Sequence, residues 1–406
     1  MRNASLTIPS ALQRYNPAMI AQPAEFRLTA LPPLALYIHI PWCVKKCPYC
    51  DFNSHTAREA LPEARYIEAL TRDLEAALPL IWGRSIHTIF FGGGTPSLFS
   101  GASIDAILTT VRSLTKLDYF AEITLEANPG TVEAAKFAEF KAAGVNRLSL
   151  GIQSFNPQHL QALGRIHDDK EAHRAVEIAA ASFDNFNLDL MYALPGQSLQ
   201  QAQADLDAAL HYAPPHLSCY HLTLEPNTPF HAAPPSLPDD DLSADMQQMI
   251  ETRLAQAGYQ HYETSAFAQP RRQSRHNLNY WQFGDYLGIG AGAHSKLSFH
   301  DRILRQMRHK HPREYMEHAL AGTPVQTENN VSRAELPFEF MMNALRLCDG
   351  VPTALFSERT GLQITAAQAA LDEAERRGLL TRDHLRIAPT ATGQRFLNDL
   401  LGLFLP

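Results

Sequence analysis

The chain has 406 residues, of which 45% are hydrophobic and 19% charged, and its 35 basic and 42 acidic residues give a net charge of −7. This composition is typical of a globular protein with enough apolar material for two or three domains. The acidic balance argues against a nucleic-acid surface, and no apolar run is long enough to cross a membrane.

Residues 1–33 are interpreted as an N-terminal extension that precedes the folded domains. They are rich in Ala and Pro, and no charged start is followed by an apolar block. We therefore expect no secretory signal and a mostly disordered segment, with an organelle transit peptide as the alternative. Five cysteines in this length are not a disulfide framework, and the expected location is the cytoplasm.

From residue 34 the sequence alternates between strand-like and helix-like segments. The first predicted helix carries Tyr66, Leu70 and Leu74 on one face, and the second is expected to begin near Ser103. A later helix is expected to end at Gly144. The predicted strands are 36–40, 86–91, 122–127, 146–152, 187–191 and 216–222.

Six strands separated by helices indicate repeated βαβ units, and the strands are interpreted as nearly continuous apolar runs, as buried parallel strands are. The predicted fold class is α/β, and residues 34–240 form an open, partial (β/α)6 TIM-like barrel. A doubly wound sheet is the alternative.

The rest of the chain is predicted to form two further parts. Residues 223–240 are rich in Pro and Asp and indicate a linker, and residues 241–327 are interpreted as a connecting region. Residues 328–406 contain short helices and a strand pair near 379–388, which predict a small helical, winged-helix-like domain. The G-I-G-A-G-A stretch at 288–293 lacks a βαβ context and is interpreted as close backbone packing.

The predicted strands end in sequences that could carry chemistry. In both fold alternatives, ligands bind at the carboxyl ends of parallel strands. The first five strands lead into a cysteine-rich stretch, G-G-G-T-P (92–96), E-A-N-P (126–129), G-I-Q-S-F (151–155) and D-L-M-Y-A-L-P-G (189–196). We therefore expect these segments to converge on one site.

The cysteine-rich stretch, H-I-P-W-C-V-K-K-C-P-Y-C-D-F, contains Cys43, Cys47 and Cys50 in C-x3-C-x2-C spacing. Cys47 and Cys50 alone form a glutaredoxin-like dithiol, but this interpretation leaves Cys43 unexplained. An iron–sulfur cluster uses all three thiolates and leaves one iron open, and it is the favoured interpretation. A zinc site needs a fourth ligand. The nearest candidates are His39, Asp51 and His55.

This cysteine spacing after the first strand, followed by a glycine-rich loop after the second, resembles the radical S-adenosylmethionine (SAM) superfamily. The resemblance implies that the three cysteines hold a [4Fe–4S] cluster whose open iron binds SAM. It also implies a set of SAM contacts: Tyr37, Gly93, Gly94, Thr95, Glu126, Gln153, Arg165 and Asp189. Arg165 suits a carboxylate and Asp189 suits ribose hydroxyls. The glycine loop and Glu126 could instead belong to ordinary turns.

Over residues 34–400 the chain resembles a narrower family, which contains oxygen-independent coproporphyrinogen III dehydrogenase and the HemW haem chaperones. The resemblance rests on Y-I-H-I-P-W-C-V-K-K-C-P-Y-C-D-F-N-S-H. The dehydrogenase has a fourth cysteine where this chain has Phe52, and a longer N-terminal segment. Both departures favour the chaperone group.

The stretch H-N-L-N-Y-W, residues 276–281, resembles a motif associated with haem in that group. It implies His276 as a haem iron ligand, with Tyr280 and Trp281 against the porphyrin, at a place outside the six-strand core. The alternative is that His276 is a structural residue near a domain junction.

The resemblance implies a cytoplasmic protein that binds a [4Fe–4S] cluster, SAM and haem and transfers haem to acceptor haemoproteins. The alternatives are the dehydrogenase itself and another radical enzyme or methyltransferase acting on porphyrins. No nucleic-acid partner is expected. Productive SAM cleavage, acceptors at the membrane and a homodimer are left open.

Overall fold

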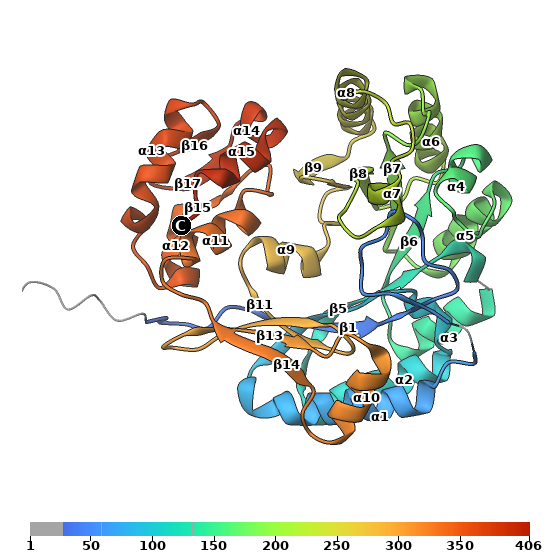
Figure 1. The fold of residues 1–406 in the computed structure, drawn as a ribbon, viewed down its shortest axis with the longest axis horizontal. Helices are drawn as coiled ribbons and strands as arrows, with labels where there is room; N and C mark the ends of the chain where they lie inside the picture. Colours follow the sequence, from blue (N-terminus) through green and yellow to red (C-terminus); the bar gives the residue numbers. More distant parts are fainter. Residues whose placement is uncertain (1–26, 58, 132–133) are drawn as a thin grey trace, which may run out of the picture.

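The structure is a computed structural model and describes residues 27–57, 59–131 and 134–406 (Figure 1). Most of the predicted N-terminal extension, residues 1–33, therefore falls outside the described residues. No helix in the described part of the chain is long and apolar enough to cross a membrane.

A sheet of twelve strands forms the centre of the described chain, in the order β14-β13-β12-β11-β1-β4-β5-β6-β7-β8-β10-β9. The six predicted strands are present and pair in parallel from β1 to β8. Their bounds are Leu34–Ile40 (β1), Ser85–Gly93 (β4), Lys116–Ala127 (β5), Arg147–Gln153 (β6), Phe186–Tyr192 (β7) and His216–His221 (β8). The sheet curves but does not close, which confirms the open α/β barrel.

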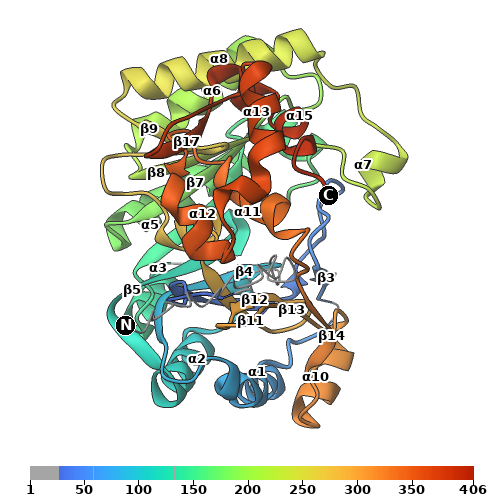
Figure 2. The ribbon, with the colours of Figure 1, turned by 90° about the vertical axis from the view of Figure 1, so that its left-hand side faces the viewer.

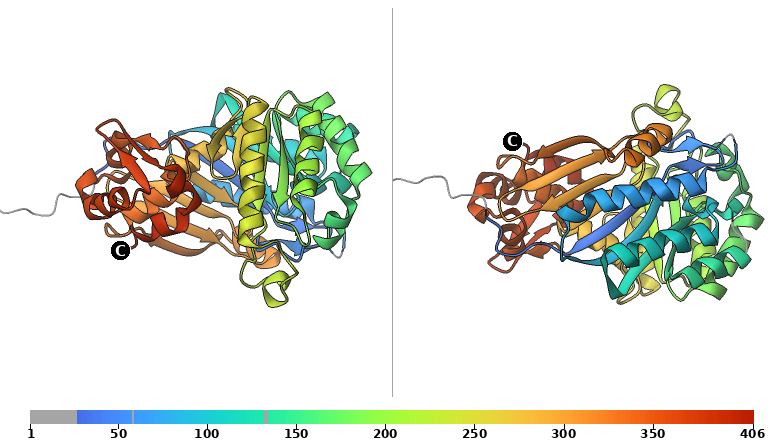
Figure 3. Two further views of the ribbon diagram at one scale, coloured as in Figure 1. Left: turned by 90° about the horizontal axis from the view of Figure 1, so that it is seen from above. Right: turned by 90° about the horizontal axis from the view of Figure 1, so that it is seen from below.

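Helices cover the outer face of this sheet, and Figure 3 shows α1 and α2 lying across the strands from below. Their bounds are Glu63–Ala77 (α1), Gly101–Leu114 (α2), Ala134–Ala143 (α3), Pro157–Ala162 (α4), Asp169–Ser182 (α5), Leu199–His211 (α6) and Asp240–Gln256 (α8). Tyr66, Leu70 and Leu74 of α1 are buried against the sheet, as their spacing predicts. One core cluster of apolar side chains joins these helices to the strands.

Two predicted helix ends can be compared with the structure. Helix α2 begins three residues before the predicted start, because its cap is Ser100, whose hydroxyl accepts the backbone N–H of Ser103 at 3.2 Å. The end of α3 is as predicted. Gly144 has φ +112°, and the next residue, Val145, donates its N–H to the carbonyl of Phe140.

The region 241–327 is not merely a connection, because it adds strands to both edges of the sheet (Figure 2). One edge carries Asp285–Ile289 (β11), His294–Ser298 (β12), Ile303–Arg308 (β13) and Val325–Asn330 (β14), and the other carries Gln260–Glu263 (β9) and Ala266–Ala268 (β10). Strand β11 is parallel to β1, and β12 to β14 continue as antiparallel neighbours. The helices of this region are Arg275–Trp281 (α9) and Pro312–Leu320 (α10).

The glycines between β11 and β12 pack tightly, as predicted for this stretch. A Cβ on Gly288 would lie 2.1 Å from the carbonyl oxygen of His294, and one on Gly290 would lie 2.5 Å from that of His39. No side chain fits at such distances, so Gly288 allows β11 to lie against the start of β12, and Gly290 allows the turn after β11 to lie against β1.

The C-terminal part has a separate apolar core and the predicted combination of short helices with a small sheet. Its helices are Leu336–Ala344 (α11), Thr353–Thr360 (α12), Gln368–Arg376 (α13), Ala391–Arg395 (α14) and Leu397–Gly402 (α15). Its strands are Val351–Pro352 (β15), Leu380–Arg382 (β16) and Arg386–Pro389 (β17).

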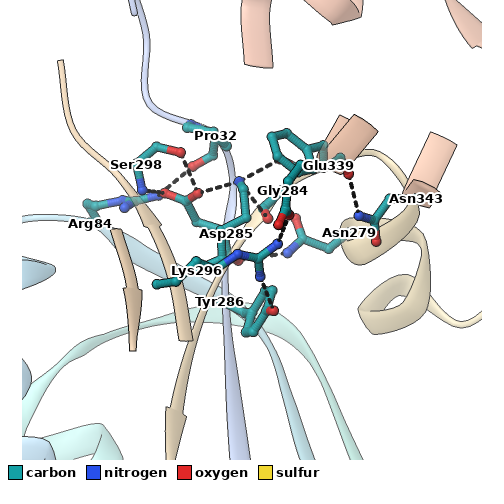
Figure 4. A network of polar contacts seen from close by, with 12 residues as sticks. Pro32, Arg84, Asn279, Gly284, Asp285, Tyr286, Lys296, Ser298, Glu339 and Asn343 are labelled. Carbon is teal, nitrogen blue, oxygen red and sulfur yellow. Dashed lines mark hydrogen bonds and ion pairs between the residues drawn. The ribbon is translucent and has the colours of Figure 1, made fainter. Parts of the chain in front are cut away.

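A buried polar network ties this C-terminal part to the edge of the large sheet (Figure 4). Asp285 at the start of β11 forms ion pairs with Arg84 at 2.8 Å and with Lys296 at 3.0 Å. Arg305 of β13 pairs with Glu339 of α11 and donates to the hydroxyl of Tyr286 at 2.6 Å. The network therefore connects β11, β12 and β13 to α11.

Candidate cofactor-binding site

A cavity of about 730 Å³ lies on the inner side of the curved sheet, a size typical of ligand sites. The cysteine loop forms part of its wall. Most of the site residues predicted from the sequence line it: Cys43, Cys47, Cys50, Gly93, Gly94, Thr95, Glu126, Gln153, Arg165 and Asp189. Tyr37, which is partly buried, and His276, which is buried, do not line it.

Three neighbouring strands line the cavity with every second residue. These residues are Arg147, Ser149, Gly151 and Gln153 of β6, Asn187, Asp189 and Met191 of β7, and His216, Ser218 and Tyr220 of β8. The alternate residues are apolar and belong to the core. The prediction of nearly continuous apolar strands is therefore wrong for β6, β7 and β8, because one of their faces borders a cavity instead of a packed interior.

The three cysteines lie in the loop that follows β1. A pair of short parallel strands, Trp42–Cys43 (β2) and His55–Thr56 (β3), closes the base of this loop. All three thiols are partly exposed, and burial raises the pKa of Cys43 and Cys50. Within the described residues, no three Cys, His, Asp or Glu side chains converge as ligands of a single metal ion would. In a cubane cluster, each cysteine binds a different iron.

His39, considered above as a zinc ligand, supports the loop from behind. Its Nε2 lies 2.9 Å from the carbonyl of Asn53, which can only accept, so Nε2 carries the proton. Nδ1 therefore accepts the hydroxyl hydrogen of Tyr37 at 3.0 Å. Burial lowers the pKa of His39 to about 4, which keeps the ring neutral. Both side chains are thus engaged in positioning the first strand and the cysteine loop.

The G-G-G-T-P loop packs directly on the cysteine loop. A Cβ on Gly93, which has φ +113°, would lie 2.4 Å from the ring of His39, and one on Gly94 would lie 2.5 Å from the carbonyl of Trp42. The backbone N–H groups of Gly94 and Thr95 donate to the carbonyls of Ile40 and Trp42, each at 2.7 Å. The glycines are therefore required for contact between the two loops.

Two partly buried carboxyl groups, Glu126 of β5 and Asp189 of β7, face the cavity. Glu126 accepts the backbone N–H of Gly93 at 3.2 Å, and burial together with the charge of Asp189 raises its pKa to about 8. Asp189 accepts from the hydroxyl of Ser149 at 3.1 Å and from the amide of Asn187 at 2.7 Å. Burial also raises the pKa of Asp189. A cationic ligand would favour the ionised form of both groups.

Arg165 lies beside the cysteine loop, after helix α4. Its guanidinium donates to the side-chain oxygen of Asn128 at 2.6 Å and to the carbonyl of Gly151 at 2.7 Å, and it lies 3.7 Å from the sulfur of Cys47. The amide of Asn128 donates in turn to the hydroxyl of Thr95 at 2.9 Å. Sequence reasoning missed Asn128 as a supporting residue, because an Asn before Pro is typical of a turn.

Gln153 ends β6 with φ +71°, a conformation that residues other than glycine seldom adopt. The strand pairing shifts register just before it, and the hydroxyl of Tyr220 donates to its side-chain oxygen at 3.4 Å. Such backbone strain gathers at functional sites, where it can turn a side chain into a pocket.

His276 lies on α9, which packs on the inner side of β1 and β4, so the expectation that this motif lies outside the six-strand core is wrong. The side chain is 1% exposed, its Nδ1 lies 2.8 Å from the hydroxyl of Thr88, and its ring packs on Phe90. Burial, with the charge of Arg147, lowers its pKa to about 3. Trp281 of the same motif does line the cavity.

Comparisons with known proteins identify the family and the fold of the chain. Residues 37–209 match the radical SAM superfamily, and residues 331–396 match the HemN C-terminal domain. The fold resembles that of coproporphyrinogen III oxidase (HemN) from Escherichia coli, with a TM-score of 0.79 at 24% identity, over 92% of this chain and 90% of that one.

Relatives of similar length match by sequence. The heme chaperone HemW of Escherichia coli is 50% identical over 382 residues, which cover 93% of this chain and 100% of the relative. That of Mycobacterium tuberculosis is 35% identical over 351 residues, 84% of this chain and 89% of the relative. The mouse mitochondrial radical S-adenosyl methionine domain-containing protein 1 is 36% identical over 92% of this chain and 87% of its own length. The chain therefore belongs to the HemW heme chaperone family of the radical SAM superfamily.

Proposed function

We propose that the chain binds a [4Fe–4S] cluster, SAM and haem, and transfers haem to acceptor haemoproteins. The observation that carries the proposal is the cavity, which brings the three cysteines together with Glu126 and Asp189. Membership of the radical SAM superfamily implies the cluster and SAM. The relatives named heme chaperone support haem as the cargo.

The residues present fit a cluster with SAM on its open iron. Cys43, Cys47 and Cys50 would supply three thiolates, and a bound cluster would favour the ionised forms of Cys43 and Cys50, whose pKa values burial raises in the free protein. SAM carries a sulfonium and an ammonium, so the carboxyl groups of Glu126 and Asp189 suit it electrostatically. The guanidinium of Arg165 suits its carboxylate.

The identity of the haem iron ligand remains a prediction. Coordination by His276 would require α9 or the ring of Phe90 to move, because the imidazole is 1% exposed. If His276 is the ligand, His276→Ala should shift the Soret band and lower haem affinity without changing the iron–sulfur spectrum. An unchanged Soret band in a folded variant would assign His276 the structural role of the alternative.

Phe52 supports the chaperone function over the dehydrogenase. It lines the cavity and is 61% exposed, at the position where the dehydrogenase has its fourth cysteine. We expect no conversion of coproporphyrinogen III to protoporphyrinogen IX by protein loaded with cluster and SAM. Steady turnover in that assay would overturn the chaperone proposal and favour the enzyme.

The proposal is tested on anaerobically reconstituted full-length protein. We expect about four irons and four sulfides per chain, a change in the electron paramagnetic resonance signal of the reduced cluster on adding SAM, and binding of haem. Haem-loaded protein should then be mixed with an apo-haemoprotein. After the two are separated by gel filtration, the acceptor should show the Soret absorbance of its haem-bound form. Bound zinc without sulfide would contradict the cluster, and failure to bind haem would contradict the chaperone function.

A further inference from the structure

Arg147, the first residue of β6, is a buried cation that forms no ion pair within the described residues. It is 2% exposed and lines the cavity, about 20 Å along the strand from Gln153. Among the described residues it makes no ion pair, and its buried Nε has no hydrogen-bond partner. Burying an unpaired charge is costly, so the position is unusual. Arg308, which is equally buried, is bonded to Asp73 at 3.0 Å.

The polar side chains next to Arg147 on β7 and β8 are already engaged with one another, whereas the hydroxyl of Thr124, its neighbour on β5, has no hydrogen-bond partner among the described residues. On β7 and β8, Asn187 and His216 interact at 2.6 Å, and the other nitrogen of His216 lies 2.8 Å from the hydroxyl of Tyr262. Burial, with the charge of Arg147, lowers the pKa of His216 well below its usual value, so that ring is neutral.

The two acidic residues nearest in the strand pattern are also occupied. Glu122 on β5 accepts the backbone N–H groups of Arg275 and His276, at 3.2 and 3.0 Å, at the start of α9. Asp189 on β7 accepts from Ser149 and Asn187. The charge of Arg147 acts against the rise in the pKa of Asp189, but neither carboxylate forms an ion pair with Arg147 within the described chain, and its Nε has no hydrogen-bond partner there.

Further donors lie on the wall opposite β6. Arg346, which follows α11, lines the same cavity, stacks 4.4 Å from the ring of Trp281 and contacts Glu263 at 3.5 Å. The Nε of Arg346 and the indole N–H of Trp281 are buried, and neither has a hydrogen-bond partner in the part of the chain that the structure describes. Guanidinium and indole N–H groups can only donate, so this end of the cavity is suited to an anion.

We propose that Arg147, with Arg346 on the facing wall, forms a carboxylate-binding subsite at the end of the cavity away from the cysteines, and that it takes a propionate of bound haem. This inference rests on the proposed function and deepens it. A guanidinium binds a carboxylate through two parallel hydrogen bonds, and Trp281 beside it offers an apolar face to the macrocycle. The carboxylate of SAM is the other source of this chemistry, but Arg165 lies nearer the cysteines.

The test compares haem with haem dimethyl ester, which lacks free carboxylates, by Soret titration of wild type and Arg147→Met. Wild type should bind the ester roughly 10- to 100-fold more weakly than haem, the difference expected for a charge-assisted hydrogen bond. Arg147→Met should bind haem as weakly as wild type binds the ester, and should no longer distinguish the two. Arg174→Met, which removes an exposed arginine of α5, is the control and should behave as wild type.

Two further measurements separate a ligand role from a structural one. The ligand-free Arg147→Met protein should melt at the same or a higher temperature than wild type, because an unpaired buried charge is replaced by an apolar side chain. A lower melting temperature would indicate that Arg147 holds the fold together. Affinity for SAM should be unchanged, and a loss confined to SAM would assign the subsite to SAM and overturn the proposal.

The outcomes distinguish this inference from the function on which it rests. Equal binding of haem and its ester by wild type would overturn the subsite and leave the chaperone function standing. Continued discrimination by Arg147→Met would place the carboxylate elsewhere and also overturn it. No haem binding by wild type would overturn both. If Arg147→Met fails to fold, the ester comparison on wild type still decides.

Discussion

Two regions of the molecule, the network around Asp285 and the cavity, shield charged side chains from solvent, and they differ in how those charges are paired. Around Asp285, burial acts to raise the pKa of the carboxyl, but Lys296 and Arg84 outweigh it and hold the pKa below its usual value (Figure 4). In the cavity, burial and the neighbouring Asp189 raise the pKa of Glu126 to about 8, and Arg147 has no ion-pair partner among the described residues. The charges around Asp285 are paired within the chain, whereas Glu126 and Arg147 of the proposed site form no ion pair among the described residues.

The largest expected effect is loss of the iron–sulfur cluster, which tests whether the cavity is a ligand site. Cys43→Ser, Cys47→Ser or Cys50→Ser should each abolish the cluster, because two remaining thiolates cannot hold three of its irons. Iron and sulfide content after anaerobic reconstitution measures the loss. Cys219→Ala, which alters a buried core thiol, is the control and should keep the cluster. Retention of a full cluster by all three variants would remove the cysteine loop from the site.

Removing Asp285 tests the paired side of the contrast. Asp285→Ala leaves the fully buried ammonium of Lys296 without its carboxylate and should lower the free energy of unfolding by about 3–5 kcal/mol. Urea denaturation monitored by circular dichroism measures the change. The matched cavity variant, Asp189→Asn, should leave stability within about 1 kcal/mol of wild type. Equal destabilisation by the two variants would break the contrast between the regions.

The same Asp189→Asn variant should fold normally but bind SAM more weakly. The carboxylate is positioned by Ser149 and Asn187, and its loss should weaken SAM binding roughly 10- to 100-fold, the cost of a hydrogen bond to a charged group. Equilibrium dialysis against labelled SAM measures the affinity, with the cluster spectrum as a check that the site is intact. Undiminished affinity would remove Asp189 from the SAM contacts.

The smallest expected effect is a pH dependence caused by Glu126. Its pKa of about 8 in the free protein means that the carboxyl is protonated at neutral pH, and a cationic ligand favours the ionised form. SAM affinity should therefore rise by up to about tenfold per pH unit as pH approaches 8 from below, and level off above it. The pH profile of SAM affinity for Glu126→Gln still contains any titration of SAM itself. Subtracting this profile from that of wild type isolates the contribution of the Glu126 carboxyl. Identical profiles would contradict this role.

How well the sequence predicts this molecule depends on whether a residue is fixed by local pattern or by distant contacts. The six parallel strands, and the site residues at their carboxyl ends, can be predicted from local apolar runs and glycine-rich turns. Glu126 and Asp189 indeed face one cavity. Strand β14, V-Q-T-E-N-N, carries almost no apolar pattern, because it is an exposed edge strand, and it could be placed only through its pairing with β13.

The inner residues of the site were partly visible in the sequence. Arg147, Asn187 and His216 each begin a run in which polar and apolar residues alternate, a two-residue period that could have revealed the cavity. The burial of His276 could not be predicted in this way. It depends on the packing of α9 against Phe90 and Thr88, which are more than 180 residues away in the chain.

The alternation along β6, β7 and β8 separates two kinds of change that evolution or a designer could make. Leu148, Leu188 and Leu217 belong to the apolar core and stabilise the fold, while Ser149, Asp189 and Ser218 face the cavity. Substitutions in the cavity row can change what is bound without disturbing the apolar row. An insertion or deletion of a single residue in these strands would exchange the two rows at once. The ligand site can therefore diversify by substitution, but not by changes in strand length.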